Sequence, residues 1–305
     1  CISCGACVYQ CPFGAITDKS YILDAIRLLK NPDNKVYAIV APSIASQFSY
    51  AKLGQVVSGL KALGFHTVVE AALGADMVAL SEARELSEKG FLTSSCCPAF
   101  VTYIRQCFPQ LLPYVSHNLS PMAAIAQYIK HITPEAKMVF IGPCTAKKAE
   151  AQLDSVKPYI DAVLTFEELQ ALFDSKALDL TVLPEDVLDN ASTFGRIFAR
   201  SGGLTDAVAQ ALKEQNIDFD LKPCACDGIE ACRVALLKKN KNMLDANFIE
   251  GMACIGGCIG GAGCLTHGDK NRASVDQYGQ QAYEKTMTDA ISVLHQRTEA
   301  AQKKA

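Results

Sequence analysis

Four cysteines at the start of the chain have a spacing that suits an iron–sulfur cluster. Cys1, Cys4, Cys7 and Cys11 form the pattern C-x2-C-x2-C-x3-C, and Pro12 follows directly. A four-iron cluster needs four thiolates, and the two-residue gaps allow successive sulfur atoms to converge on it. A zinc site or a disulfide pair would use the same residue type, but this spacing favours the cluster.

The run resembles the cluster-binding loop of bacterial ferredoxins, in which the fourth cysteine ligates the other cluster of a two-cluster domain. Cys11 is therefore predicted to bind either the same cluster as the first three cysteines or a second one. The ligands of that second cluster would precede Cys1. We expect residues 1–20 to be part of a ferredoxin-like domain, truncated at its N-terminus, through which electrons enter.

The composition of the whole chain excludes several classes of function. The 305 residues include 29 Lys and Arg against 32 Asp and Glu, so no excess of cations exists to bind nucleic acid. The apolar runs are too short to span a membrane. Fourteen cysteines are too few for a small disulfide scaffold, and the chain opens without a signal peptide. We expect a cytoplasmic protein with reduced cysteines and no nucleic-acid or membrane partner.

From residue 21 onwards, short apolar runs alternate with helical patterns. Strands are expected at 36–40, 67–69, 90–93, 138–141 and 162–164, and helices at 22–29, 54–63, 77–89, 121–132, 166–173 and 205–213. Thr165 and Glu168 have the spacing of a capping box. The alternation predicts an α/β domain over residues 21–305, with mainly parallel sheets flanked by helices and a polar helical tail at 277–305.

Several candidate functional residues follow these strands directly. The segments 41–43, 93–98 and 142–144 each come after a predicted strand, and two of them carry cysteines. Because the carboxyl ends of parallel strands line the ligand crevice, we expect these loops to converge. Cys254 and Cys258 lie in a glycine-rich segment that would allow the backbone to approach a bulky cofactor closely. A dinucleotide loop is disfavoured there, since no clear βαβ unit surrounds it.

Three segments resemble the signature motifs of [FeFe]-hydrogenases: TSSCCPAF at 93–100, GPCTAKKAE at 142–150 and EGMACIGGC at 250–258. The segments 41–43, 63–65 and 74–76 also resemble that family. The resemblance runs in order from Cys1 to about Gly263. It implies a two-lobed H-cluster domain and the reaction 2H⁺ + 2e⁻ ⇌ H₂.

An H-cluster is a four-iron cubane bridged by a cysteine to a two-iron unit that carries CO, cyanide and a dithiolate. The resemblance implies cubane ligands at Cys97, Cys144, Cys254 and Cys258, with Cys258 as the bridge. It further implies that Lys147 donates a hydrogen bond to an iron-bound cyanide. The pocket would be lined by Pro42, Ser43 and Met252.

A buried site that consumes protons needs a route for them. Glu82 and Glu85 lie three residues apart, on one face of a predicted helix, which suits a carboxylate relay. By resemblance, Cys96 is the terminal proton donor, and Glu82, Ser116 and Glu85 complete the route, with Lys89 at its outer end. The implied partners are ferredoxin or a similar electron carrier and the hydrogenase maturation proteins.

Three positions differ from the catalytic pattern of the family. Gly142 replaces a methionine, Phe100 a tryptophan and Met122 a glutamine. These departures indicate a divergent, sensory subgroup. Two alternatives to the enzyme therefore stay open: an H₂ sensor with low turnover, and a non-enzymatic hydrogenase-like iron–sulfur protein.

The remaining thiols and imidazoles have weaker interpretations. Cys224, Cys226 and Cys232, with Cys264, could bind a further cluster or sense redox state, although partly buried free thiols are favoured. Cys107 is expected in the core. The histidines show no ligand spacing and are expected to be structural or surface residues; they are His66, His117, His131, His267 and His295.

Overall fold

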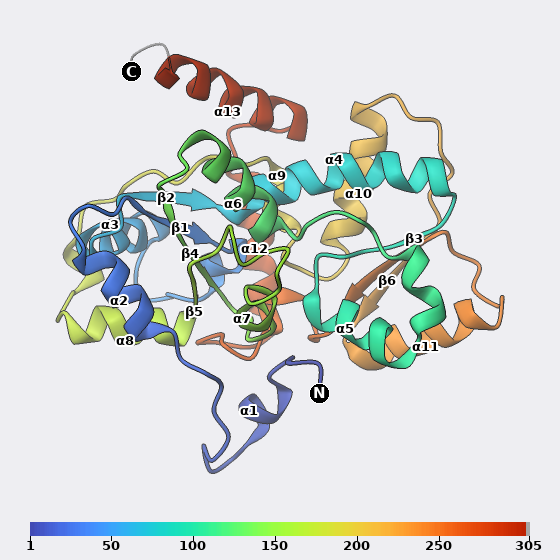
Figure 1. Ribbon diagram of the computed structural model, residues 1–305, viewed down its shortest axis with the longest axis horizontal. Coiled ribbons are helices and arrows are strands. Elements are labelled where there is room, and N and C mark those ends of the chain that lie inside the picture. Colours follow the sequence, from blue (N-terminus) through green and yellow to red (C-terminus); the bar gives the residue numbers. More distant parts are fainter. Residues whose placement is uncertain (303–305) are drawn as a thin grey trace.

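Two separate parallel sheets organise the computed structural model, which describes residues 1–302 and the side chains of residues 1–294 (Figure 1). The first sheet has the order β2 (Thr67–Glu70), β1 (Val36–Val40), β4 (Lys137–Gly142), β5 (Ala162–Thr165). The second has the order β3 (Leu92–Thr93), β7 (Phe248–Met252), β6 (Pro223–Asp227). All pairs of neighbouring strands are parallel. The predicted two-lobed α/β fold is confirmed.

Helices surround both sheets. Their bounds are α1 Ala6–Gln10, α2 Ile22–Lys30, α3 Leu53–Leu63, α4 Ala71–Lys89, α5 Pro98–Cys107, α6 Pro121–Ile132, α7 Ala146–Glu150, α8 Phe166–Ser175, α9 Thr193–Ile197, α10 Gly203–Glu214, α11 Ile229–Asn240, α12 Lys270–Gln280 and α13 Met287–Gln302. Short 3-10 turns occur at Pro42–Ser46, Pro109–Tyr114, Leu180–Val182 and Cys258–Gly260. No helix among the described residues is long and apolar enough to cross a bilayer.

The four-stranded sheet forms where the sequence has continuous apolar runs. Its strands β4 and β5 are buried along almost their whole length, because α2, α3, α6 and α8 contribute to the apolar core around the sheet. The capping box at the start of α8 is present, with Thr165 and Glu168 each bonded to the other's backbone amide. The strands predicted at 36–40, 67–69, 138–141 and 162–164 are confirmed.

Of the three-stranded sheet, the sequence predicts only the strand at 90–93. Gly90 ends α4 in the left-handed conformation, with φ of 71°, so the strand expected at 90–93 shortens to two residues. β7 alternates across the sheet: Phe248 and Met252 pack on the α4 and α10 side, and Ile249 packs on the α5 and α11 side. Glu250 and Gly251 interrupt its apolar pattern, which concealed the strand.

Helix α4 joins the two sheets and begins earlier than predicted. It starts at Ala71, directly after β2, and its first turns carry small residues. A methyl group at Gly74 would lie 2.1 Å from the carbonyl oxygen of Pro121, so α6 can approach α4 closely only at a glycine. Further along α4, Glu82 and Glu85 face the segment after β3 and residues 116–118.

The tail expected at 277–305 begins inside α12 and continues as α13. It is more than a surface wrap, because Met287 and Ala290 are buried against the body. Figure 1 shows α13 along one edge of the molecule. Residues 303–305 lie outside the described residues.

A buried ionic network connects α9 and α12 to the end of β2. Arg196 on α9 donates to both carboxylate oxygens of Glu70 at 2.8 and 2.9 Å and to Asp189 at 2.6 Å. Tyr278 donates to Glu70 at 2.6 Å. The Arg196 side chain is 2% exposed, so its charge depends on these partners rather than on water.

We expect Arg196→Ala to lower the free energy of unfolding by about 3–5 kcal/mol, because Glu70 would remain buried without its cation. Urea unfolding of the full chain measures this change. Arg27→Ala is the matched control, since its ion pair with Asp24 is exposed and contributes little. Equal midpoints for the two variants would show that the network is not stabilising.

Candidate metal centre and proton route

Strand ends from both sheets meet at one small cavity. It has a volume of about 80 Å³ and a lining that is almost wholly apolar. Pro42 follows β1, Cys97 follows β3, Cys144 follows β4, and Met252 ends β7; all four line it, together with Cys258. The convergence predicted for the three strand-end loops is confirmed.

Three of the four predicted cubane ligands, Cys97, Cys144 and Cys258, line this cavity, and Cys254 lies close enough to interact with all three. Burial and the neighbouring Cys97 raise the pKa of Cys144 to about 11. The pKa values of Cys254 and Cys258 are also raised by burial and by the other thiols of the group. Because such effects require short distances, the four predicted cubane ligands lie near one another. Iron bound there would stabilise the thiolates that burial disfavours.

All fourteen cysteines are free thiols in the structure. Within the part of the chain that the structure describes, no three His, Cys, Asp or Glu side chains are arranged around a point where one metal ion could bind. The donor set at the cavity is four sulfurs from three loops, which is the set that a four-iron cluster uses.

The loop that carries Cys258 requires glycine. Gly257 has φ of 82°, and a methyl group there would lie 2.6 Å from the amide nitrogen of Ser201. The close approach allows the Cys258 amide to donate to the carbonyl of Ala199 at 2.8 Å. The glycine-rich run therefore packs the loop tightly against the opposite lobe.

Two polar groups accompany the thiols. The Lys147 ammonium lines the cavity, donates to the carbonyl oxygen of Cys96 at 3.2 Å and pairs with Glu150 at 2.6 Å. Burial opposes its charge, but Glu150 outweighs this effect and raises the pKa of Lys147. The Ser43 hydroxyl is fully buried and has no hydrogen-bond partner among the described residues. An unpartnered hydroxyl next to Pro42 fits a site that holds a polar cofactor.

Cys96 and Glu82 form the inner part of the predicted proton route. Burial raises the pKa of the Cys96 thiol well above its usual value, and Glu82 adds to this shift. Glu82 is fully buried, accepts a 3.4 Å hydrogen bond from the Ser95 amide, and leaves its second oxygen unpartnered. Burial raises the pKa of Glu82 to about 8, against the opposing effect of Ser116.

The outer part of the route reaches solvent. Glu85 accepts from Ser116 at 3.1 Å, from Asn118 at 3.0 Å and from Lys89 at 2.6 Å. These donors outweigh the effect of burial and lower the pKa of Glu85. The four predicted relay residues are therefore neighbours, with Ser116 bonded to Glu85 and Glu82 close to both Cys96 and Ser116.

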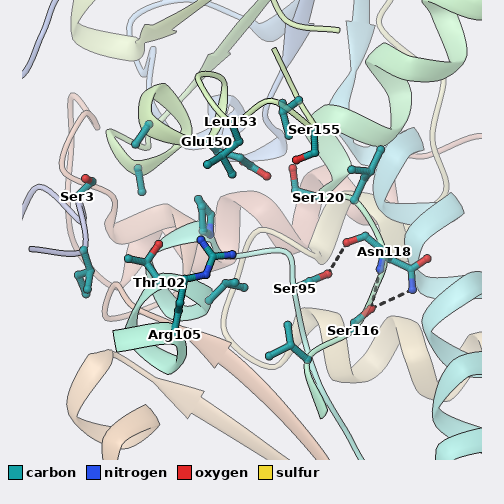
Figure 2. Close-up of a pocket in the computed structure, with 18 of the residues that line it drawn as sticks. Ser3, Ser95, Thr102, Arg105, Ser116, Asn118, Ser120, Glu150, Leu153 and Ser155 are labelled. Atoms are coloured by element: carbon teal, nitrogen blue, oxygen red, sulfur yellow. Dashed lines mark hydrogen bonds between the residues drawn. The ribbon is translucent and has the colours of Figure 1, made fainter. Parts of the chain in front are cut away.

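A surface groove of about 430 Å³ runs beside this route (Figure 2). Ser95, Ser116 and Asn118 form one of its walls, and Figure 2 shows Glu150 on the opposite side. Asn118 and Glu150 were not singled out from the sequence. Glu150 stands inside the second motif, three residues after Lys147, so helical spacing could have identified it as a partner.

The first three cysteines of the N-terminal run share a hollow on the surface of the body. Cys1, Cys4 and Cys7 line it together with Thr145 and Lys148, but Cys11 does not. The backbone amides of residues 13, 15, 16 and 14 lower the pKa of Cys11. Cys4 also contributes to the raised pKa of Cys254, so the two groups of thiols are neighbours.

The three departures from the family pattern lie at the cavity or next to residues that line it. A methyl group at Gly142 would lie 2.7 Å from the ring of Phe140, which itself lines the cavity. The ring of Phe100 fills the space beside Gly251, where a methyl group would meet it at 2.2 Å. Met122 lines the cavity directly. The rings of Phe140 and Phe100 thus occupy the space that side chains larger than glycine at positions 142 and 251 would need.

Some expectations need correction. Cys107 is exposed rather than in the core; it is the last residue of α5, beyond the buried Phe100 and Ile104. Ser43 is buried beside the cavity but is not among the residues that line it. His66, His117, His131 and His267 are surface residues, as expected. The side chain of His295 lies outside the described part.

Comparisons with known proteins agree with this arrangement. Residues 34–262 match the family "Iron only hydrogenase large subunit, C-terminal domain", and residues 1–17 match a "4Fe-4S binding domain". The chain is 29% identical to the "NADP-reducing hydrogenase subunit HndD" of Solidesulfovibrio fructosivorans, over 88% of this chain and 57% of that protein. It is 31% identical to the "Cytosolic Fe-S cluster assembly factor NAR1" of Eremothecium gossypii, over 59% of this chain and 43% of that protein.

Solved structures show the same fold. An apo [FeFe]-hydrogenase from Chlamydomonas reinhardtii superposes with a TM-score of 0.72 at 22% identity, covering 91% of this chain and 94% of that one. The chain spans about half the length of the curated hydrogenase relatives it matches. Since the family match extends over most of its length, the chain belongs to the iron-only hydrogenase family, in the part defined by the C-terminal domain of the large subunit.

Proposed function

We propose that this chain binds an H-cluster and catalyses the reversible reduction of protons, 2H⁺ + 2e⁻ ⇌ H₂, as a ferredoxin hydrogenase of the [FeFe] class. The observation that carries the proposal is one juxtaposition. Cys97, Cys144, Cys258 and Lys147 line one apolar cavity together with Cys96, whose pKa is affected by Glu82, and Ser116 donates to Glu85 further out. The proposal places the protein in the cytoplasm, with ferredoxin or a similar carrier as its electron donor.

The residues present fit the proposed cofactor. Cys97, Cys144, Cys254 and Cys258 would hold the cubane, and Cys258 would bridge to the two-iron unit. When bound, that group supplies the iron at which electrons and protons combine. Lys147 would donate to a cyanide, and its pair with Glu150 fixes the ammonium at the cavity wall. The apolar lining, which includes Pro42 and Met252, would exclude water.

Electrons would enter through the cluster of the N-terminal run. Cys4 lies beside Cys254, so a cluster held by Cys1, Cys4 and Cys7 would lie next to the cubane. Cys11 would either complete that cluster or bind another one. Loading of the two-iron unit is proposed to depend on the hydrogenase maturation proteins.

The two glutamates of the route have opposite protonation states at neutral pH. Glu85 is a carboxylate, held so by Lys89 and by the donors of Ser116 and His117, and it can accept a proton from solvent. Glu82 is mostly protonated, since burial raises its pKa to about 8, and it can donate toward Cys96. Two carboxyl groups whose environments shift their pKa values in opposite directions can act as the proton acceptor and the proton donor of a relay.

A second candidate is an iron–sulfur protein with slow or no hydrogen chemistry, such as an H₂ sensor. The similarity to proteins named as assembly factors favours it, as does the ring of Phe140 at the cavity. The intact line from Cys96 to Glu85 favours the enzyme, because a protein without proton chemistry has no need of it.

Infrared spectroscopy separates these candidates. Protein produced with the maturation proteins is expected to show bands of iron-bound CO and cyanide and to evolve H₂ from reduced ferredoxin. We expect Cys258→Ala to lose these bands, because the bridge is removed, while its circular dichroism stays unchanged. A protein with full cubane iron but no such bands would support the non-enzymatic candidate.

We expect Cys96→Ala to lower the rate of H₂ evolution by about 10²- to 10⁴-fold, the contribution of a positioned proton donor. The infrared bands should remain, since Cys96 holds no iron in this proposal. Cys107→Ala removes an exposed thiol and is the matched control. Unchanged H₂ evolution in the Cys96 variant would remove this residue from the route.

The raised pKa of Glu82 predicts a pH-dependent stability. Between pH 4.5 and about 8 the unfolded chain loses this proton while the folded chain keeps it, so the free energy of unfolding falls as pH rises. Relative to Glu82→Gln, the wild-type protein should lose on the order of a few kcal/mol between pH 5 and pH 8.5. Urea unfolding of both proteins measures the difference, and an equal difference at both pH values would contradict the assignment. Glu185→Gln, on the exposed surface, is the control.

A further inference from the structure

Three thiols outside the candidate metal centre lie together at the edge of the second sheet. The Sγ atoms of Cys224 and Cys226 are 3.9 Å apart on β6. Cys232, on α11, interacts with Cys226 and donates to the carbonyl oxygen of Met252 at 3.5 Å. Neither the proposed cofactor nor the proton route uses any of them.

Their exposure differs in a way that orders their reactivity. Cys224 is partly exposed, whereas Cys226 and Cys232 are buried. A thiol reagent in solution therefore reaches Cys224 first, and Cys226 is the thiol that lies next to it. The bond with Cys226 and burial raise the pKa of Cys224, so the thiol is its resting form and exchange proceeds through the small deprotonated fraction.

The geometry of β6 permits a disulfide but strains it. Residues two apart on a strand point to the same face, with Cα atoms about 6.4–6.8 Å apart. This lies at the upper end of the range for a disulfide, about 4.4–6.8 Å, so closing the bond must draw the two residues together. β6 can bend because it is an edge strand, paired with β7 alone. A strained bond of this kind is readily reduced again.

The end of β6 holds the loop that carries Cys254. Asp227, the residue after Cys226, accepts a hydrogen bond from the Gly256 amide at 2.5 Å. Two residues further on, the Ile229 amide donates to the carbonyl of Ala253 at 3.0 Å. A bend at Cys224 and Cys226 therefore acts directly on residues 253–256.

We propose that Cys224 and Cys226 form a reversible thiol–disulfide pair, oxidised by low-molecular-weight disulfides, and that closing it loosens the loop around Cys254. The Cys224 thiolate attacks the disulfide reagent, forms a mixed disulfide and releases one thiol. The Cys226 sulfur then attacks the Cys224 sulfur and releases the second thiol. Two protein thiols lose two protons and two electrons, and the reagent disulfide gains them as two thiols.

The test uses the cluster-loaded full chain under anaerobic conditions, in glutathione buffers of increasing disulfide content. After acid quenching and alkylation, cleavage before Asp227 separates the pair from Cys232. We expect the fragment with Cys224 and Cys226 to lose both alkyl groups as the buffer becomes oxidising, and to regain them in the reducing buffer. Hydrogen exchange at residues 253–256 should become roughly 3- to 10-fold faster in the oxidised form.

Matched variants make the result specific. Cys226→Ser should stop at a glutathione adduct on Cys224, and Cys232→Ser should still form the pair. Cys107, a lone exposed thiol, should form only the adduct. Full alkylation of Cys224 and Cys226 in the most oxidising buffer, or a bond between Cys226 and Cys232, would overturn the pairing. Unchanged hydrogen exchange in the oxidised form would overturn its link to the loop. Neither readout depends on hydrogenase activity.

Discussion

The structure depends on one electrostatic constraint: several cysteine sulfurs and one ammonium lie close together where burial opposes charge. Thiolates in such a place are strongly disfavoured, as the raised pKa values of Cys144, Cys254 and Cys258 show. A cationic iron–sulfur core would compensate for this cost. Binding of the cluster would therefore stabilise thiolates that burial disfavours. The strand ends, the glycine-rich loop and the α4–α6 contact all serve to bring these sulfurs together.

The same constraint explains why the proposed proton route has two halves. The inner half, Cys96 and Glu82, is buried, and burial favours the neutral form of both groups. The outer half, around Glu85, has Lys89 and several hydrogen-bond donors and stays charged. The change from a protonated carboxyl group at Glu82 to a carboxylate at Glu85 therefore coincides with the boundary between interior and solvent, which suits directed proton transfer.

Two glycines beside aromatic rings shape the candidate site. Gly142 leaves room for the ring of Phe140, which lines the cavity, and Gly251 leaves room for the ring of Phe100. A methyl group at either glycine would displace the ring next to it, so these glycines fix the positions of the two rings.

The sequence by itself determined the four-stranded sheet, the order of the motifs and the identity of the thiols, because apolar runs and cysteine spacing are local signals. It could not reveal β6 and β7, since Cys224, Glu250 and Gly251 break the apolar pattern of a buried strand. Only the tertiary structure decided that Glu250 caps α10, that Glu150 fixes Lys147, and that Cys11 lies apart from the hollow of Cys1, Cys4 and Cys7. These facts depend on segments far apart in the chain or on the direction of a side chain. Burial, which shifts the pKa of Glu82, exists only once the chain has folded.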